Sequence, residues 1–240
     1  MSALNALSAL AGRYALSDGQ LHQLDALLEC VAGDREAPTA VTDRAGILRD
    51  HLADSLVALS LEEVRSATRI ADLGAGAGFP GLALAIALPR ARVSLVESNG
   101  RKCAFIAGAI EAARVSNAAV VRARAESWSD GLGTCDLVTA RALASLPVVA
   151  EYAAPLLAVR GSLVAWRGQR DPAEEAAGAR AAAELGLKPE PVTWVEPYPG
   201  AMHRHLHLMR KVGPTPDRFP RRPGMADKRP LGGPSDRPRR

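Results

Sequence analysis

The sequence of 240 residues predicts an α/β fold with a seven-stranded, mostly parallel sheet, one antiparallel strand and a small N-terminal helical cap. Three observations lead to this prediction. Between residues 69 and 186, short apolar runs alternate with segments of helical periodicity, as in parallel sheets with crossover helices. A glycine-rich turn follows the first apolar run. After Gly186 the alternation is replaced by two facing runs that predict a hairpin.

The N-terminal cap, residues 1–60, is predicted to be helical. Apolar side chains keep a helical stripe over residues 4–32, and Ser17 is a suitable N-cap between two helices. A third helix is expected at about 43–60, with His51 and Ser55 one turn apart on the same face. A single histidine in such a helix is interpreted as structural rather than catalytic.

The α/β domain is expected to span residues 61–212. Because right-handed crossovers connect parallel strands, the alternation gives a doubly wound sheet. The expected strands lie near 69–73, 92–97, 118–123, 135–140 and 161–167, and the expected helices near 79–88, 100–114, 145–158 and 171–186.

The predicted hairpin pairs residues 191–195 with residues 203–209 and supplies the antiparallel strand. His203, His205 and His207 point to one face of the second strand because side chains alternate with a period of two. Flat strand spacing suits a tetrahedral metal site poorly, and no Cys or carboxylate completes the set. We therefore expect a polar outer face and no metal.

The glycine-rich turn, residues 72–81 (DLGAGAGFPG), is the main candidate for ligand binding. Glycines are needed where the backbone takes positive φ or touches a ligand, and the free amides of the following helix face that ligand. The next strand ends in Glu97, a little over 20 residues further on, where an acid can hold ribose hydroxyls.

Two cofactors compete for this turn. Residues 76–81 match the G-x-G-x-x-G fingerprint of NAD enzymes, which leaves an NAD-dependent oxidoreductase as the alternative. However, Phe79 and Pro80 add bulk where a pyrophosphate must approach closely, and Asp72 suits a cationic ligand. The turn and the hairpin together favour S-adenosylmethionine, which carries a sulfonium and no phosphate.

Two further strand ends complete the candidate site, because ligands of such sheets bind beyond the carboxyl ends of the strands. The third strand ends near Ala125 and Glu126, which could receive an adenine ring and its amino group. The fourth ends in Arg141, where the carboxylate of the cofactor or the substrate would arrive. A solvated helix start for Glu126 and a surface ion pair for Arg141 are the alternatives.

The net charge of +4 is unevenly distributed. Residues 210–240 carry ten Lys and Arg against three Asp, so that residues 1–209 sum to −3. With seven prolines, residues 213–240 are predicted to form a flexible basic tail that binds a polyanion, most simply nucleic acid. A nucleic-acid-binding module with an unused cofactor loop is therefore another alternative.

The remaining composition favours a cytoplasmic protein. Cys30, Cys103 and Cys135 form no CxxC pair, which indicates reduced thiols. No signal peptide or run of about 20 apolar residues is present in the sequence, so we expect no membrane span.

Several motifs in order resemble the family of ribosomal RNA small subunit methyltransferase G, also called glucose-inhibited division protein B. The resemblance covers about residues 17–232. The motifs are residues 51–55 (HLADS), 72–81 (DLGAGAGFPG), 140–146 (ARALASL), 204–206 (RHL), 219–225 (FPRRPGM) and 228–231 (KRPL). Residues 34–40 depart from the aromatic and Asn-rich run that members often have there.

The resemblance implies a class I methyltransferase with a Rossmann-like sandwich. It would move a methyl group from S-adenosylmethionine to N7 of one guanine in 16S rRNA, on naked RNA or on the small ribosomal subunit, and act as a monomer. By position, the resemblance implies cofactor contacts from Gly74, Phe79, Ala125, Glu126 and Arg141, to which the strand pattern adds Glu97. Guanine N7 carries no proton, so no catalytic residue is expected.

Overall fold

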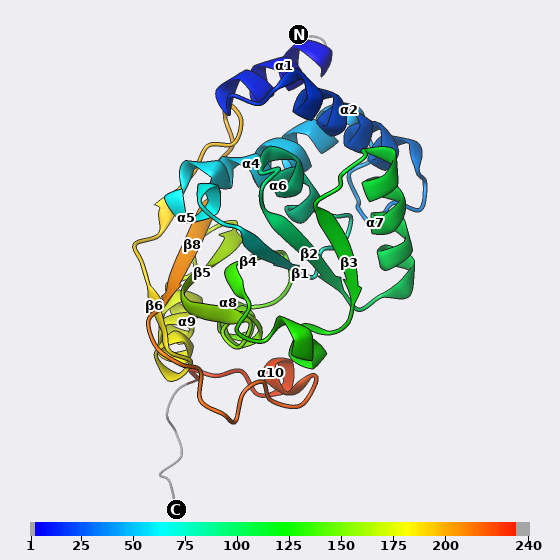
Figure 1. The fold of residues 1–240 in the computed structure, drawn as a ribbon. Coiled ribbons are helices and arrows are strands. Elements are labelled where there is room, and N and C mark those ends of the chain that lie inside the picture. The colour runs from blue at the N-terminus through cyan, green and yellow to red at the C-terminus, as the bar shows by residue number, and fades with distance from the viewer. Residues whose placement is uncertain (1–2, 234–240) are drawn as a thin grey trace, which may run out of the picture.

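The computed structural model describes residues 3–233. The chain begins with α1 (Ala3–Arg13) and α2 (Asp18–Gly33), which lie at one end of the molecule (Figure 1). Ser17 caps α2 as predicted: its hydroxyl accepts a hydrogen bond from the Gln20 amide, and the Gln20 side chain accepts one from the Ser17 amide. This reciprocal capping box satisfies two amides that the first turn of a helix leaves free.

The predicted third helix is confirmed as one helical run, but its winding changes along its length. It consists of α3 (Arg44–Gly46), the π-helical segment η1 (Ile47–Ala53), α4 (Asp54–Leu56) and the 3₁₀ turn η2 (Val57–Ser60), followed by α5 (Glu62–Arg65). The run is almost entirely buried from Leu52 to Leu59. The helical conformation of these residues is therefore stabilised by their packing against the sheet domain, and not by helix propensity alone.

The sheet contains the predicted strands. They are β1 (Arg69–Leu73), β2 (Arg92–Glu97), β3 (Ala118–Arg122), β4 (Cys135–Arg141), β5 (Leu157–Arg167), β6 (Leu187–Pro189), β7 (Thr193–Trp194) and β8 (His205–Lys211). The order is β3-β2-β1-β4-β5-β8-β6, and β1 to β5 are parallel. The carboxyl ends of β1, β2, β3 and β4 therefore meet at one edge.

The prediction of one antiparallel strand is confirmed. β8 runs antiparallel to β5, and both β6 and β7 pair with β8 from its other side. β6 and β7 are two segments of one edge, separated at Pro191, which has no amide to donate to the ladder. The eight strands therefore correspond to the seven that were expected.

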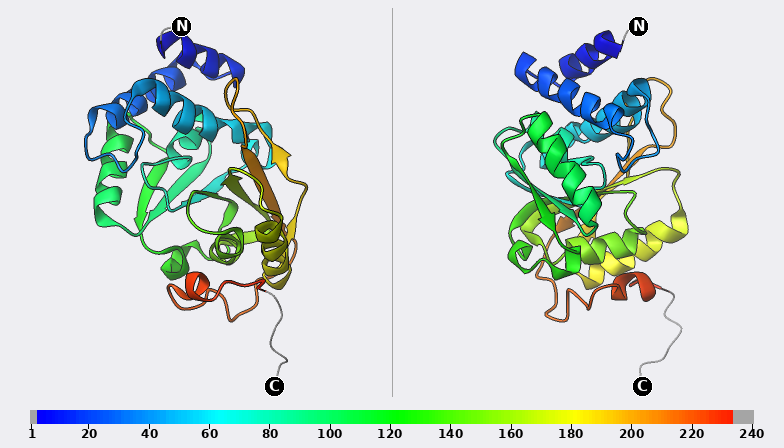
Figure 2. Two further views of the ribbon diagram at one scale, coloured as in Figure 1. Left: turned by 180° about the vertical axis from the view of Figure 1, so that it is seen from behind. Right: turned by 90° about the vertical axis from the view of Figure 1, so that its right-hand side faces the viewer.

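Helices cover both faces of the sheet (Figure 2). One face packs against α2, the 44–60 run, α6 (Gly81–Ala87) and α7 (Gly100–Ala112), around a core of Leu and Ile side chains. The other face packs against α8 (Leu146–Ala153) and α9 (Pro172–Glu184). No helix within residues 3–233 is long and apolar enough to cross a membrane.

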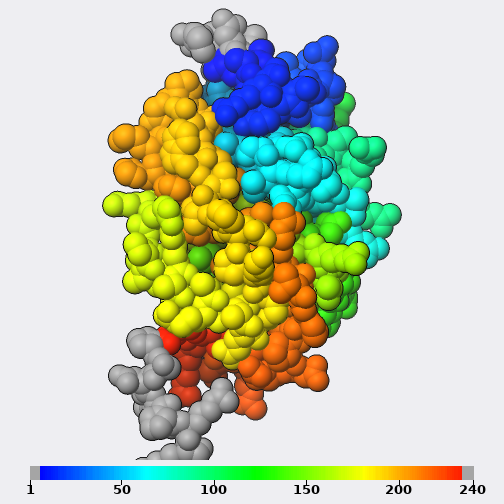
Figure 3. Space-filling view, turned by 90° about the vertical axis from the view of Figure 1, so that its left-hand side faces the viewer, coloured from blue at the N-terminus to red at the C-terminus, as the bar shows by residue number. Residues whose placement is uncertain are grey.

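The expected flexible tail is wrong for residues 213–233. Phe219 and Ala226 are buried in the core beneath α8, and the short helix α10 (Met225–Lys228) packs there. Arg221 donates to both carboxylate oxygens of Glu151, which is 2% exposed. The charge and proline content of this segment suggested flexibility, but it could not show that Phe219, Ala226 and Arg221 have buried partners. In Figure 3 the tail (red) lies at the end opposite α1 and α2 (blue); residues 234–240, the rest of that prediction, lie outside the described residues.

Candidate functional site

The glycine turn adopts the conformations that glycine alone takes readily. Gly74, Gly76 and Gly78 have φ of +66°, +58° and +92°, in the region that side chains disfavour. A Cβ at Gly74 would lie 2.6 Å from Leu143 Cδ1, so the turn is also closely packed on its outer side. Gly74 and Gly76 are partly exposed and the rest of the turn is buried, and Gly74 lines the cavity described below.

Asp72 does not face a ligand, contrary to the interpretation from sequence. Its side chain is 0% exposed and lies beneath the turn. One carboxylate oxygen accepts from the Gly81 amide at 2.9 Å, and the other accepts from the Thr139 hydroxyl at 2.9 Å. Burial raises the pKa of Asp72 to about 6. The acid therefore ties the strand to the start of α6 and does not bind a cation.

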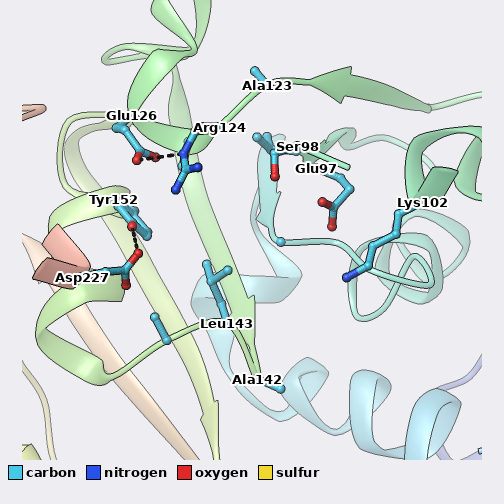
Figure 4. Close-up of a pocket in the computed structure, with 14 residues that line it drawn as sticks. Glu97, Ser98, Lys102, Ala123, Arg124, Glu126, Ala142, Leu143, Tyr152 and Asp227 are labelled. Atoms are coloured by element: carbon cyan, nitrogen blue, oxygen red, sulfur yellow. Dashed lines mark hydrogen bonds and ion pairs between the residues drawn. The ribbon is translucent and has the colours of Figure 1, made fainter. Parts of the chain in front are cut away.

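A cavity of about 320 Å³ lies beyond the carboxyl ends of β1 to β4 (Figure 4). Four of the six predicted site residues line it: Gly74, Glu97, Ala125 and Glu126. In Figure 4, Glu97 and Lys102 lie on one side and Glu126 on the other. The structure therefore brings together the residues expected at three separate strand ends.

Glu97 is held firmly at the end of β2. Its carboxylate accepts hydrogen bonds from the amides of Asn99 at 2.8 Å and Gly76 at 3.3 Å. The side chain is largely buried yet lines the cavity. This orientation links the second strand to the glycine turn and keeps the carboxylate in the wall of the cavity.

Glu126 meets the C-terminal segment instead of forming a solvated helix start. Its Oε1 accepts from the Gly224 amide at 2.8 Å and from Arg124 Nε at 3.3 Å. Nearby, the Tyr152 hydroxyl donates to Asp227 at 2.9 Å, and both residues line the cavity. The segment expected to be a separate arm therefore forms one wall of the candidate cofactor site.

Phe79 and Arg141 are not part of the lining of this cavity. Phe79 is buried and stacks on His51, with ring centroids 5.0 Å apart. The Arg141 guanidinium lies over the same Phe79 ring, 5.8 Å from its centroid. Burial, helped by the charge of Arg141, lowers the pKa of His51 to about 4, so this imidazole is neutral at pH 7. The structural role expected for His51 fits these contacts.

Arg141 instead lines a second cavity, of about 380 Å³, which shares Ala142 with the first. Arg141 Nη1 donates to Asp54 Oδ2 at 3.0 Å and to the Asp50 carbonyl at 3.1 Å. The alternative of a surface ion pair is wrong, because both side chains are mostly buried. The second cavity lies among the 44–60 run, the ends of β4 and β5, and the residues before β8.

The three histidines near β8 do not form a common polar face. His207 is 7% exposed and lies against Glu175 of α9, and burial lowers its pKa. His205 hydrogen-bonds the Gly168 carbonyl at 2.8 Å, and His203 precedes the strand with a positive φ. Within residues 3–233 no group of three His, Cys, Asp or Glu is placed to hold a metal ion.

The sequence did not predict that Asp54 and Asp227 would line the two cavities. Asp54 lies one turn beyond His51 in the same helical run, and that spacing could have placed both toward one site. Asp227 lies in the segment taken for a flexible tail, and no local signal placed it near β4. Tyr152 and Trp166 were equally unmarked by any motif.

Comparison with known proteins identifies one family. The rRNA small subunit methyltransferase G family (GidB) matches residues 20–206. The protein named ribosomal RNA small subunit methyltransferase G of Chloroflexus aggregans is 40% identical over 223 residues, covering 90% of this chain and 92% of its own. The protein of the same name from Rubrobacter xylanophilus is also 40% identical, over 89% of this chain and 85% of its own.

Solved structures confirm the fold class. An S-adenosylmethionine-dependent methyltransferase from Aquifex aeolicus superposes with a TM-score of 0.54 at 14% identity, over 70% of this chain and 93% of that chain. TYW2 of Pyrococcus horikoshii, in complex with MeSAdo, gives a TM-score of 0.52 at 16% identity, over 68% and 63%. At these identities the likeness concerns the fold.

Proposed function

The chain belongs to the rRNA small subunit methyltransferase G family, and on that premise we propose that it transfers a methyl group from S-adenosylmethionine to N7 of one guanine in 16S rRNA. The observation that carries the proposal is the first cavity, which joins the glycine turn, Glu97 and Glu126 at the carboxyl edge of the sheet. The substrate is free 16S rRNA or the small subunit, and we propose that a monomer acts in the cytoplasm.

The residues of the first cavity fit the cofactor. We propose that the Gly74 backbone faces the methionine part, Glu97 accepts hydrogen bonds from the ribose hydroxyls, and Ala125 and Glu126 meet the adenine. The lining of the cavity supports this, since Gly74, Glu97, Ala125 and Glu126 all contribute to its wall. Arg141 would act from the adjoining cavity, which it lines together with Ala142, and Phe79 would act by holding the Arg141 guanidinium over its ring.

The chemistry needs little from the protein beyond position. When bound, the cofactor supplies an electrophilic methyl group on a sulfonium. The acceptor N7 has a lone pair and no proton, so this chain need not supply a general base. Holding two reactants in line contributes up to roughly 7–11 kcal/mol in favourable systems. We therefore assign binding and alignment, and no proton transfer, to the side chains of the site.

The test is methyl transfer from labelled S-adenosylmethionine to 30S subunits, naked 16S rRNA and precursor rRNA, with the modified base mapped. Label at guanine N7 in one of these RNAs is the expected result. Transfer to none of them would overturn the proposal and favour an RNA-binding module. Thermal-shift measurements with S-adenosylhomocysteine and with NAD distinguish a methyltransferase from an NAD-dependent oxidoreductase. Stabilisation of the protein by NAD alone would favour the oxidoreductase.

A further inference from the structure

The second cavity contains a buried carboxylate oxygen with no hydrogen-bond donor in the part of the chain that the structure describes. Asp54 is 6% exposed, and its Oδ2 accepts from Arg141. Its Oδ1 forms no hydrogen bond, although Arg204 Nε approaches to 3.4 Å. An unsatisfied buried acceptor costs roughly 1–3 kcal/mol, more when charged. Such an atom in the wall of a cavity is available to accept a hydrogen bond from a ligand.

The walls around Asp54 suit a flat aromatic ligand. Trp166 and Val195 line the cavity and are each 6% exposed. The Trp166 indole N–H donates to the Asp54 carbonyl at 2.7 Å, which fixes the ring against the helical run. Enzymes that act on a base in RNA or DNA stack the turned-out base on such side chains and read its Watson–Crick edge.

The location also suits an acceptor. The two cavities share Ala142 at the end of β4, so a base in the second cavity adjoins a cofactor in the first. The helical run that carries Asp54 contributes Asp50, His51 and Asp54 to the wall of the second cavity. The second cavity therefore lies next to the proposed donor site.

We infer that the second cavity receives the target base, and that Asp54 Oδ1 selects guanine by accepting hydrogen bonds from its N1–H and 2-amino group. This inference rests on the proposed function and names the group that reads its substrate. An ionised carboxylate only accepts hydrogen bonds, and guanine alone among the RNA bases offers two adjacent donors. N7 lies on the opposite side of the purine, so this contact leaves N7 free for the methyl group.

Arg204 is the movable part of the wall. Its side chain is 35% exposed, whereas that of Arg141 is 15% exposed. The incoming base displaces the Arg204 guanidinium from Oδ1, while Arg141 stays on Oδ2 and opposes the burial that raises the pKa of Asp54. Arg204 then becomes available to an RNA phosphate, which is the usual partner of a freed guanidinium.

The test compares two RNAs that differ by one amino group. In the RNA form that proves to be methylated, the mapped guanosine is replaced by inosine, which keeps N7 and N1–H but lacks the 2-amino group. The wild-type protein is expected to favour guanosine in kcat/KM by ~10-fold or more, as for a good bidentate base contact. Asp54→Asn is expected to bring this ratio close to one by slowing the guanosine RNA.

Asp50→Asn is the matched control, because Asp50 lines the same cavity but already binds Arg49 and the Tyr198 hydroxyl. It should retain the wild-type ratio. The Kd of Asp54→Asn for S-adenosylhomocysteine should stay unchanged, since a general folding defect would raise it.

Equal slowing of both RNAs by Asp54→Asn would overturn the inference, as would a wild-type protein that does not distinguish inosine from guanosine. If Asp54→Asn does not fold, the guanosine-to-inosine ratio of the wild-type protein tests the inference by itself. Absence of methyl transfer to every RNA is a different outcome, which removes the proposed function and this inference with it.

Discussion

The two adjoining cavities are built in different ways. The first follows the carboxyl ends of β1 to β4, with Gly74 of the glycine turn, the acids Glu97 and Glu126, and the C-terminal segment in its walls. The second is made of side chains from distant segments, centred on the Asp54–Arg141 pair. The first cavity lies where sheets of this kind commonly bind their ligand, whereas the second depends on a particular set of side chains. The following changes test whether the two cavities are separable.

The largest effect is expected from Arg221→Ala, which removes the partner of buried Glu151 in the segment that walls the first cavity. An uncompensated buried charge costs about 3–5 kcal/mol of unfolding free energy. Urea denaturation measures this loss. Arg170→Ala is the matched control, since Arg170 makes the same two-point contact with Glu175 at the surface and should lose far less. Equal losses would mean that the segment is not anchored as the structure has it.

Asp72 is expected to make stability depend on pH below neutrality. Burial raises its pKa to about 6, whereas an unfolded Asp titrates near 4. The folded protein then holds the proton more tightly, so the free energy of unfolding falls as pH rises from about 4 to about 6. The wild type should lose on the order of 3 kcal/mol relative to Asp72→Asn across this window. Parallel pH curves for the two proteins would contradict the raised pKa.

Gly74→Val should damage the first cavity alone. A β-branched side chain at φ +66° adds roughly 1–3 kcal/mol of strain and collides with Leu143. Affinity for S-adenosylhomocysteine, measured by calorimetry, should fall about tenfold to hundredfold. Gly108→Val is the control, because Gly108 has an ordinary φ and open space around it. Retained affinity would place the cofactor elsewhere.

Arg204→Ala should have the smallest effect and should be confined to the second cavity. The loss of one phosphate contact weakens RNA binding several-fold and lowers the slope of log affinity against log salt by about 1. Affinity for S-adenosylhomocysteine should not change. Arg90→Ala, an exposed arginine in the loop before β2, serves as control. A matching loss of cofactor affinity would show that the cavities are coupled.

Sequence predicted the first cavity well because its signals are local. The spacing of glycines, the acid at Glu97 and the alternation of strands and helices lie within short stretches, and periodicity carries them. The second cavity was not predicted from the sequence because Asp54, Trp166 and Arg204 are brought together only by tertiary packing. The ordered packing of the C-terminal segment was not predicted for a related reason. Phe219 joins a buried cluster that includes residues of α8, and Arg221 pairs with Glu151 of α8, which lies 70 residues earlier in the chain.

The pair of hydrogen bonds beneath the glycine turn has a consequence for the thermodynamics of ligand binding. Because Asp72 fixes the Gly81 amide and Thr139 to one strand, the turn is rigid before any ligand arrives. The conformational entropy of ordering four glycines is thus lost on folding, and association with a small molecule does not repeat that loss. A ligand of this turn therefore binds without the entropic cost of ordering the loop.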